Sequence, residues 1–221
     1  TTDNLAITSA PFGSASIMPI PWAYIKMMGP DGLKRATEVA ILSANYMMHK
    51  LKHAYATKYT NKKGLCAHEF ILDCSEFRKH GIEAKDIAKR LMDFGFHAPT
   101  VSFPISTGLM LEPTESEPKD ECDRYCEALA TIKEEIDRIA RKEMAYDDSP
   151  LKHAPHTIED LINDKWDRAY SKEHAVYPGS WQKTRFHGKG QQKIWPSVSR
   201  INDLHGDQNV ICTCPPVSSY T

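Results

Sequence analysis

Phe94-Gly95-Phe96-His97-Ala98-Pro99-Thr100 and Leu109-Met110-Leu111-Glu112-Pro113-Thr114-Glu115-Ser116-Glu117 are the stretches that decide the predicted fold. Ile87, Leu91 and Phe94 recur at helical spacing, and Gly95 suits the left-handed position just after a helix end. The second stretch passes from an extended apolar segment into the polar start of another helix. A helix end, an extended crossing and a helix start in close succession predict a site on the rim of a sheet.

A long amphipathic helix is predicted upstream of this region. From Asp31, the candidate N-cap, small and apolar side chains recur at three- and four-residue steps as far as Leu51. Before it, Pro21 suits the first turn of a short helix that ends near Gly29. Phe70-Ile71-Leu72, within residues 64–73, indicates a strand.

Downstream, two short extended segments are predicted at about residues 100–103 and 107–112. Ser116 and Pro118 then begin another helix. Its unbroken apolar stripe comprises Cys122, Cys126, Leu129, Ile132, Ile136 and Ile139. The two cysteines on this stripe are interpreted as small buried hydrophobic side chains.

The order helix, strand, helix, strand, strand, helix predicts an α+β fold, with helices in a second layer on one face of a small sheet. After about Tyr146 no period of 2 or 3.6 persists, and Pro, Trp, His and Ser become more frequent. A long segment without periodicity is expected to wrap another surface. Trp166, Trp181 and Trp195 are therefore expected to anchor it to the body or to another part of the protein.

Composition indicates a globular protein without a strong electrostatic preference. The 221 residues are 41% hydrophobic and 26% charged, and the formal net charge is −1. This balance favours neither a nucleic acid nor a membrane surface as a partner. Six cysteines are too few for a secreted disulfide scaffold of this length, which favours a reducing compartment.

Several motifs closely resemble the C-terminal part of the glycine decarboxylase family, the pyridoxal-phosphate-dependent P-proteins of the glycine cleavage system. Besides the two stretches above, they are Ala10-Pro11-Phe12-Gly13-Ser14-Ala15-Ser16, Tyr24-Ile25-Lys26-Met27-Met28-Gly29-Pro30 and Cys212-Thr213-Cys214-Pro215-Pro216. The resemblance runs through nearly the whole chain. It implies the small C-terminal domain of a fold-type I pyridoxal enzyme, the same α+β arrangement that the periodicities predict.

The resemblance also implies three regions. Residues 1–30 would be a linker and loop segment from the large cofactor domain, 31–146 the small α/β C-terminal domain, and 147–221 an irregular wrapping tail. In the family, the lysine that binds pyridoxal 5′-phosphate lies in a segment upstream of the motif that corresponds to residues 10–16 here. No such segment precedes Thr8. We therefore expect this chain alone to be inactive.

Further implications concern partners and compartment. The full enzyme would be a homodimer that decarboxylates glycine and passes the aminomethyl group to the lipoyl H-protein. The partners expected here are thus the rest of the enzyme and the H-protein. The Cys-Thr-Cys-Pro-Pro ending resembles that of members in the mitochondrial matrix, while a bacterial cytoplasmic source is the alternative.

Gly13, Ser14 and Ser16 are the candidate cofactor-binding residues. The glycine lets backbone amides converge, and the two hydroxyls precede a helical stretch, a combination that suits a phosphate. The alternative is a helix-capping turn. The resemblance favours the phosphate, because fold-type I enzymes often complete that site with residues of the neighbouring subunit.

His97, Thr114 and Glu115 are the candidate catalytic residues. A loop histidine can donate a hydrogen bond or carry a proton near neutral pH, although it can also simply tie down the loop backbone. Thr114 or Ser116 could cap the following helix, with Glu117 completing a capping box from Thr114. Capping leaves Glu112 and Glu115 unexplained, which makes them the preferred functional carboxylates.

Other functions have weaker support. His205, Cys212 and Cys214 offer three zinc ligands at no recognised spacing, so no metal site is predicted. The Cys-x-Cys pair could instead form a redox-responsive tail. The basic run from Lys183 to Lys193, with aromatic residues interleaved, could bind single-stranded nucleic acid or an acidic partner, although a solvated segment is simpler. The resemblance adds docking of the H-protein as a candidate role for this run. The alternative to an enzyme domain is a non-catalytic interaction module.

Overall fold

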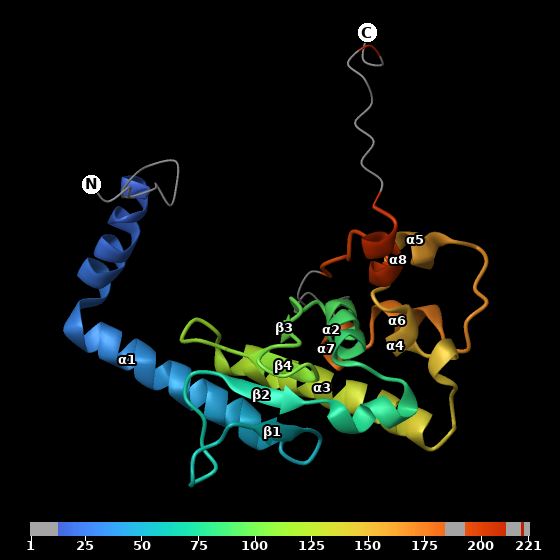
Figure 1. Ribbon diagram of the computed structural model, residues 1–221, viewed down its shortest axis with the longest axis horizontal. Coiled ribbons are helices and arrows are strands. Elements are labelled where there is room, and N and C mark those ends of the chain that lie inside the picture. Colours follow the sequence, from blue (N-terminus) through green and yellow to red (C-terminus); the bar gives the residue numbers. More distant parts are fainter. Residues whose placement is uncertain (1–12, 184–192, 211–217, 219–221) are drawn as a thin grey trace, which may run out of the picture. The chain divides into compact units, whose positions relative to one another are not determined.

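The computed structural model describes residues 13–183, 193–210 and 218. Its longer elements are α1 (Pro19–Leu51), β1 (Ala56–Lys58), β2 (Phe70–Asp73), α2 (Ala84–Asp93), β3 (Thr100–Val101), β4 (Gly108–Leu111) and α3 (Lys119–Ala140) (Figure 1). The strands form one sheet in the order β1-β2-β4-β3. This arrangement confirms the predicted α+β class.

The strands run antiparallel. β1 pairs with β2 in that sense, with Thr57 opposite Leu72. The Cys74 amide, just after β2, donates to the Thr107 carbonyl just before β4 at 2.9 Å, and Ser102 donates to Gly108 at the same distance. β2 therefore ends where β4 begins, which brings the residues before β2 close to those after β4. β1 was not predicted from the sequence, because a strand of only three residues is too short to give a recognisable pattern.

Contacts divide the chain into two compact units. The first comprises Thr1–Asp73 and Met110–Cys126, and the second comprises Cys74–Leu109 and Glu127–Thr221. In the first unit, the second half of α1 buries Ala44, Met47 and Leu51, and the thiol of Cys126 lies 4.0 Å from the Met47 carbonyl. Cys122 and Cys126 are both buried, as predicted, and burial raises the pKa of Cys126 to about 12.

The first half of α1 is separated from the second by a kink. Gly29 has a φ of 64° and a ψ of −179°, a left-handed conformation that glycine adopts readily, and the ribbon bends sharply there (Figure 1). The predicted helix break at Gly29 is thus confirmed. The prediction that Asp31 caps the second part was wrong, because Pro30 is already helical and Asp31 lies in the first turn.

In the second unit, α2 is closed as expected. Gly95 follows the C-cap Phe94 with a φ of 88°, and its amide donates to the Met92 carbonyl. The core of this unit includes Ile87 and Leu91 of α2 and, from α3, Leu129 and Ile132.

The segment after Tyr146 is largely irregular, as predicted, but it contains short helices that the sequence analysis did not predict. They are η3 (Tyr146–Asp148), α4 (Pro150–His153), α5 (Ile158–Ile162), α6 (Lys172–Val176), α7 (Ser180–Lys183) and α8 (Asp203–Gln208). Helices of three to six residues are too short to produce a periodic pattern. Among the described residues, no helix is long and apolar enough to cross a membrane.

Candidate functional site

The loop between β4 and α3 carries two of the predicted site residues. Thr114 has a φ of 56°, and its hydroxyl lies 2.7 Å from that of Ser116, whose amide also donates to Thr114 at 3.2 Å. α3 begins only at Lys119, so the predicted capping box from Thr114 to Glu117 was wrong. Thr114 instead closes a tight local turn, because its hydroxyl bonds two residues ahead rather than three.

Glu115 is held by the first half of α1. The Tyr24 hydroxyl donates to Glu115 Oε1 at 3.0 Å, and both residues are exposed. This hydrogen bond to the carboxylate, together with its charge, raises the pKa of Tyr24 above its ordinary value of 10.0. The pair fixes the direction of one Glu115 oxygen and leaves the carboxylate open to a ligand.

Glu112 lies in a different group, with His68 and Glu69. The antiparallel pairing explains this, since Glu69 directly precedes β2 and Glu112 directly follows β4. The possible ligand atoms of the three residues lie within 4.8 Å of one another, and His68 Nε2 is 3.8 Å from Glu69 Oε2. An imidazole and two carboxylates are a donor set that divalent transition metals accept. His68 and Glu112 are both exposed.

Gly13, Ser14 and Ser16 form the turn that leads into η1 (Ala15–Ile17) and α1. Gly13 has a φ of 78°, with open space where a Cβ would lie. Ser14 occupies the N-cap position of η1, but its hydroxyl makes no capping hydrogen bond there. Both serines are exposed. The Ser14 hydroxyl therefore does not cap η1, and the phosphate role of these residues stays a prediction.

His97 belongs to the second unit and is exposed, two residues after Gly95. Its loop is anchored at Asp93, the last residue of α2. The Asp93 carbonyl accepts hydrogen bonds from Gln182 Nε2 at 2.9 Å and from Lys193 Nζ at 2.6 Å. The ring of Trp181 lies 6.0 Å from that of Phe94 and 6.1 Å from that of Phe96. Residues of the C-terminal segment thus hold the backbone from which His97 projects.

Trp181 therefore anchors the C-terminal segment to the body, as predicted. Trp166 and Trp195 pack instead within that segment, against Tyr170 and Tyr177. Burial lowers the pKa of Lys193 to about 8, and its ammonium lies 5.2 Å from the centre of the Trp195 ring.

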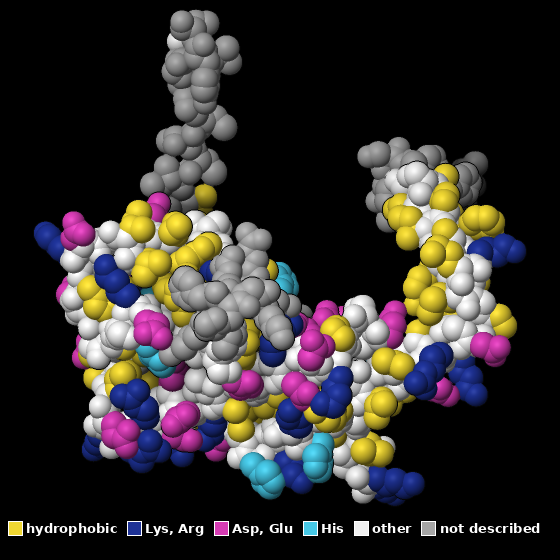
Figure 2. All heavy atoms as spheres, turned by 180° about the vertical axis from the view of Figure 1, so that it is seen from behind, with side chains coloured by type: hydrophobic (Ala, Val, Ile, Leu, Met, Phe, Trp, Pro, Cys, Tyr) yellow, Lys and Arg dark blue, Asp and Glu magenta, His cyan; other side chains and the backbone are white. Residues whose placement is uncertain are grey.

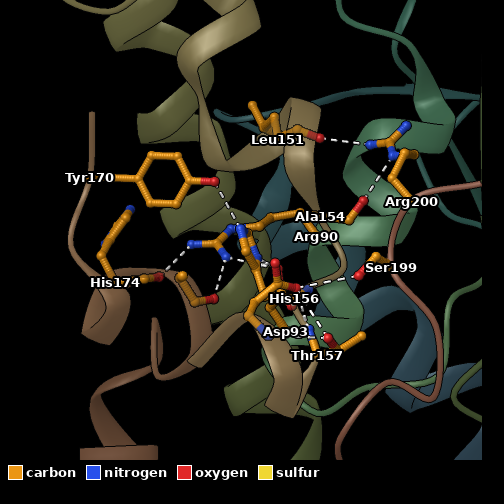
Figure 3. A network of polar contacts seen from close by, with 12 residues as sticks. Arg90, Asp93, Leu151, Ala154, His156, Thr157, Tyr170, His174, Ser199 and Arg200 are labelled. Atoms are coloured by element: carbon orange, nitrogen blue, oxygen red, sulfur yellow. Dashed lines mark hydrogen bonds and ion pairs between the residues drawn. The ribbon is translucent and has the colours of Figure 1, made fainter. Parts of the chain in front are cut away.

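A polar network that was not predicted from the sequence lies next to this loop, and Figure 3 shows it. We call it the Asp93 cluster; it comprises Arg90, Asp93, Glu135, His156, Tyr170 and His174. Arg90 is fully buried, yet each of its five N–H groups has an acceptor. These acceptors are both carboxylate oxygens of Glu135, one oxygen of Asp93, and the carbonyls of His174 and Ala175, all at 2.8–3.1 Å.

Pairing keeps Arg90 and Glu135 of this cluster charged. Burial opposes the charges, but the attraction between Arg90 and its two carboxylates outweighs it, so the pKa of Arg90 is raised and that of Glu135 lowered. His156 is also fully buried. Its backbone amide and Nδ1 lie 2.6 and 2.8 Å from the Asp93 carboxylate, while Nε2 lies 2.8 Å from the Tyr170 hydroxyl. We interpret the cluster as a structural anchor, because the side chains of Arg90, Asp93 and His156 are fully buried and paired with one another or with backbone carbonyls.

The sequence carries only a weak signal for this cluster. Arg90 and Asp93 are charged residues on the buried side of α2, which they share with Ile87 and Leu91. His153 and His156 form a His-x-x-His pair, but their side chains have different contacts: His156 lies against Asp93, while the ring centre of His153 lies 6.3 Å from that of Tyr170. Cys212 and Cys214 lie outside the described residues.

Comparisons with known proteins identify relatives over the whole chain. A family model described as "Glycine dehydrogenase, C-terminal domain" matches residues 36–156. The chain is 51% identical to glycine dehydrogenase (decarboxylating) of Yersinia enterocolitica over all 221 residues. Proteins of the same name from Bdellovibrio bacteriovorus and Teredinibacter turnerae are 51% and 48% identical over 97% and 98% of the chain. The chain spans about 22% of the length of each relative.

Proposed function

Because the chain belongs to the glycine dehydrogenase C-terminal domain family, we propose that it supplies that domain to a pyridoxal-phosphate-dependent glycine decarboxylase. The observation that carries this proposal is the 48–51% identity over nearly the whole chain to proteins of that name. The complete enzyme decarboxylates glycine and transfers the remaining aminomethyl group to the lipoyl arm of the H-protein. The share of this chain is to bind and orient groups at the edge of the active site.

Gly13, Ser14 and Ser16 are proposed to hold the cofactor phosphate. Their exposure and the absence of a capping bond from Ser14 support this role. When bound, pyridoxal phosphate supplies the electron sink that the loss of carbon dioxide requires. The lysine that binds the cofactor is proposed to belong to another part of the enzyme.

His97, Thr114 and Glu115 are proposed to face the substrate. His97 is exposed on an anchored loop, so its imidazole can donate a hydrogen bond or move a proton without displacing the backbone. Thr114 and Glu115 have defined orientations, set by Ser116 and Tyr24. A preoriented Glu115 carboxylate repels the carboxylate of the bound substrate. This repulsion is relieved when the substrate carboxylate leaves as carbon dioxide, which favours decarboxylation over simple binding.

The proposed partners are the remaining part of the enzyme, a second copy in a homodimer, and the H-protein. The relatives named above are bacterial, which favours the bacterial cytoplasm over the mitochondrial matrix. Neither a nucleic acid nor a membrane is proposed as a partner, since the net charge is only −1.

The test combines this chain with the remaining part of the Yersinia enterocolitica relative, expressed separately. We expect glycine-dependent release of labelled carbon dioxide only in the mixture, with a loss of at least about tenfold for Ser14→Ala and for His97→Ala. Full activity of both variants would leave the family role intact and refute these two site residues. Association without decarboxylation would favour a non-catalytic interaction module.

A further inference from the structure

The first half of α1 carries apolar side chains in contact with solvent. We call residues 17–27 the exposed apolar segment. Its large hydrophobic side chains are 43–86% exposed: Ile17, Met18, Ile20, Trp22, Tyr24, Ile25 and Met27. Figure 2 shows hydrophobic side chains on both sides of this part of the helix. Lys26 is the single charged residue among these eleven positions.

This pattern differs from that of an ordinary surface helix. A surface helix has one apolar stripe, whereas a helix that is apolar all round is found buried. Here Met18, Trp22 and Ile25 line one side, and Ile20, Tyr24 and Met27 line the next. Contiguous exposed apolar surface of this kind marks an interaction site.

The shape of the apolar surface restricts the occupant. A second copy packed helix against helix would cover one stripe and leave the remaining sides exposed. A membrane is a poor fit, because an apolar stretch of eleven residues is far shorter than the roughly 20 residues that span a bilayer. A groove in a larger body can surround the helix on several sides.

The relatives contain much more polypeptide than this chain matches. Their matched region includes the exposed apolar segment, since the Yersinia enterocolitica protein aligns over all 221 residues, yet it accounts for only 22% of that protein. The segment is also continuous with the candidate site, because Tyr24 bonds Glu115. Resting on the function proposed above, we propose that the exposed apolar segment inserts into an apolar groove of the remaining part of the glycine dehydrogenase polypeptide.

The consequence for the site is direct. Insertion of residues 17–27 brings Ser14, Ser16 and the Tyr24–Glu115 pair to the surface of the remaining polypeptide. The turn before α1 and the loop after β4 therefore reach the active site through one docking step. Lys26 is the residue expected at the edge of the groove, where its ammonium stays in water.

The test measures the dissociation constant between the 221-residue chain and the remaining part of the Yersinia enterocolitica protein by isothermal titration calorimetry. The double variant W22S/I25S changes two side chains that are 64% and 53% exposed. We expect its dissociation constant to rise at least about 30-fold, because both side chains are buried only in the complex. The matched control I41S/L42S changes two apolar side chains of the second half of α1, which are 40% and 66% exposed, and should change it less than about threefold.

Three results would overturn the inference. If W22S/I25S and the control bind alike while the parent mixture is active, the docking surface is wrong and the proposed function stands. If the parent chain neither binds the remaining polypeptide nor restores activity, both fail. If light scattering shows that the chain alone is a dimer that W22S/I25S dissociates, the occupant is a second copy.

Discussion

The exposed apolar segment and the Asp93 cluster depart from the usual rule of burial in opposite directions. In the segment, the side chain of Met27 is 86% exposed, whereas Arg90 and Asp93 of the cluster are fully buried. Residue type alone therefore does not decide which side chain is buried. What decides is whether partners are present: every N–H group of Arg90 has an acceptor within its own unit, while Met27 has no such cover in the described chain.

The comparison predicts which substitutions the chain can tolerate. Changes in the Asp93 cluster should lower the stability of the chain itself. Changes in the exposed apolar segment should leave that stability unaltered and weaken only association with the remaining polypeptide.

The largest effect is expected for Arg90→Met, which leaves Glu135 and Asp93 buried without their cation. Removal of one partner from a buried ion pair costs about 3–5 kcal/mol of unfolding free energy. Arg35→Met is the matched control on α1, since Arg35 is 73% exposed and lies 3.8 Å from Glu38. Its effect should stay below about 0.5 kcal/mol. Urea unfolding measures both, and equal losses would refute the distinction between the two regions.

Lys193, whose ammonium donates to the Asp93 carbonyl, tests burial next to the Asp93 cluster through the pH dependence of stability. In the folded chain the pKa of Lys193 is about 8, below its ordinary value of 10.5. Between pH 8 and 10.5, the Lys193 side chain is therefore protonated in the unfolded chain and largely unprotonated in the folded chain. The contribution of Lys193 therefore makes the chain more stable as the pH rises from 8 to 10.5, by up to about 3 kcal/mol.

The difference in unfolding free energy between the parent and Lys193→Met should grow in favour of the parent over that pH range. Lys85→Met serves as control, since its side chain is 52% exposed. A constant difference between parent and Lys193→Met would show that Lys193 is not buried in solution.

Trp181 tests whether the C-terminal segment holds the loop of His97. Trp181→Ala removes the ring beside Phe94 and Phe96 and should cost about 1–3 kcal/mol of stability. Amide hydrogen exchange at residues 94–97 should accelerate at least about tenfold. Trp166→Ala is the control, because it removes an indole from the same unit that packs on Tyr170 instead.

Trp181→Phe should restore slow exchange, since it retains an aromatic ring at this position. Equal exchange of residues 94–97 in the two alanine variants would show that Trp181 does not hold the loop.

The smallest effect concerns the Tyr24–Glu115 pair. Glu115→Gln removes the charge that raises the pKa of Tyr24, so the tyrosine should titrate closer to 10.0. Carbon-13 NMR of the labelled tyrosine ring measures the shift, and the melting temperature should not change. Glu117→Gln should leave the Tyr24 titration where it is; a similar shift in both variants would indicate a general charge effect.

The candidate site was partly predictable. The loops with Gly13, His97 and Glu115 were found because glycines, prolines and helix ends leave local signals. The side chains that contact these loops in the folded protein were not predicted. Tyr24 lies 91 residues from Glu115, and Gln182 lies 89 residues from Asp93. Contacts over such separations depend on how the elements pack, which no local pattern records.

The C-terminal segment after Tyr146 was also predicted only in part. Trp181 was correctly predicted to anchor the C-terminal segment to the body, because large aromatic side chains bury well wherever they meet a surface, but Trp166 and Trp195 pack within the segment. Its short helices were missed, since four residues such as Pro150–His153 complete barely one turn. The caps of Ser149, Thr157 and Ser171 were visible in the sequence, but a cap without an apolar period is a weak signal.

By itself, the sequence determined the α+β class, the C-terminal ends of the helices at Leu51 and before Gly95, and the family resemblance, because these follow from the spacing and identity of residues that are near neighbours along the chain. Only the tertiary structure decided that Arg90 is enclosed by Glu135 and Ala175, 45 and 85 residues away, and that no described residue covers Trp22 and Met27. The physical reason is that the free energy of a buried charge or an exposed apolar side chain depends on every group around it, and those groups are gathered by packing.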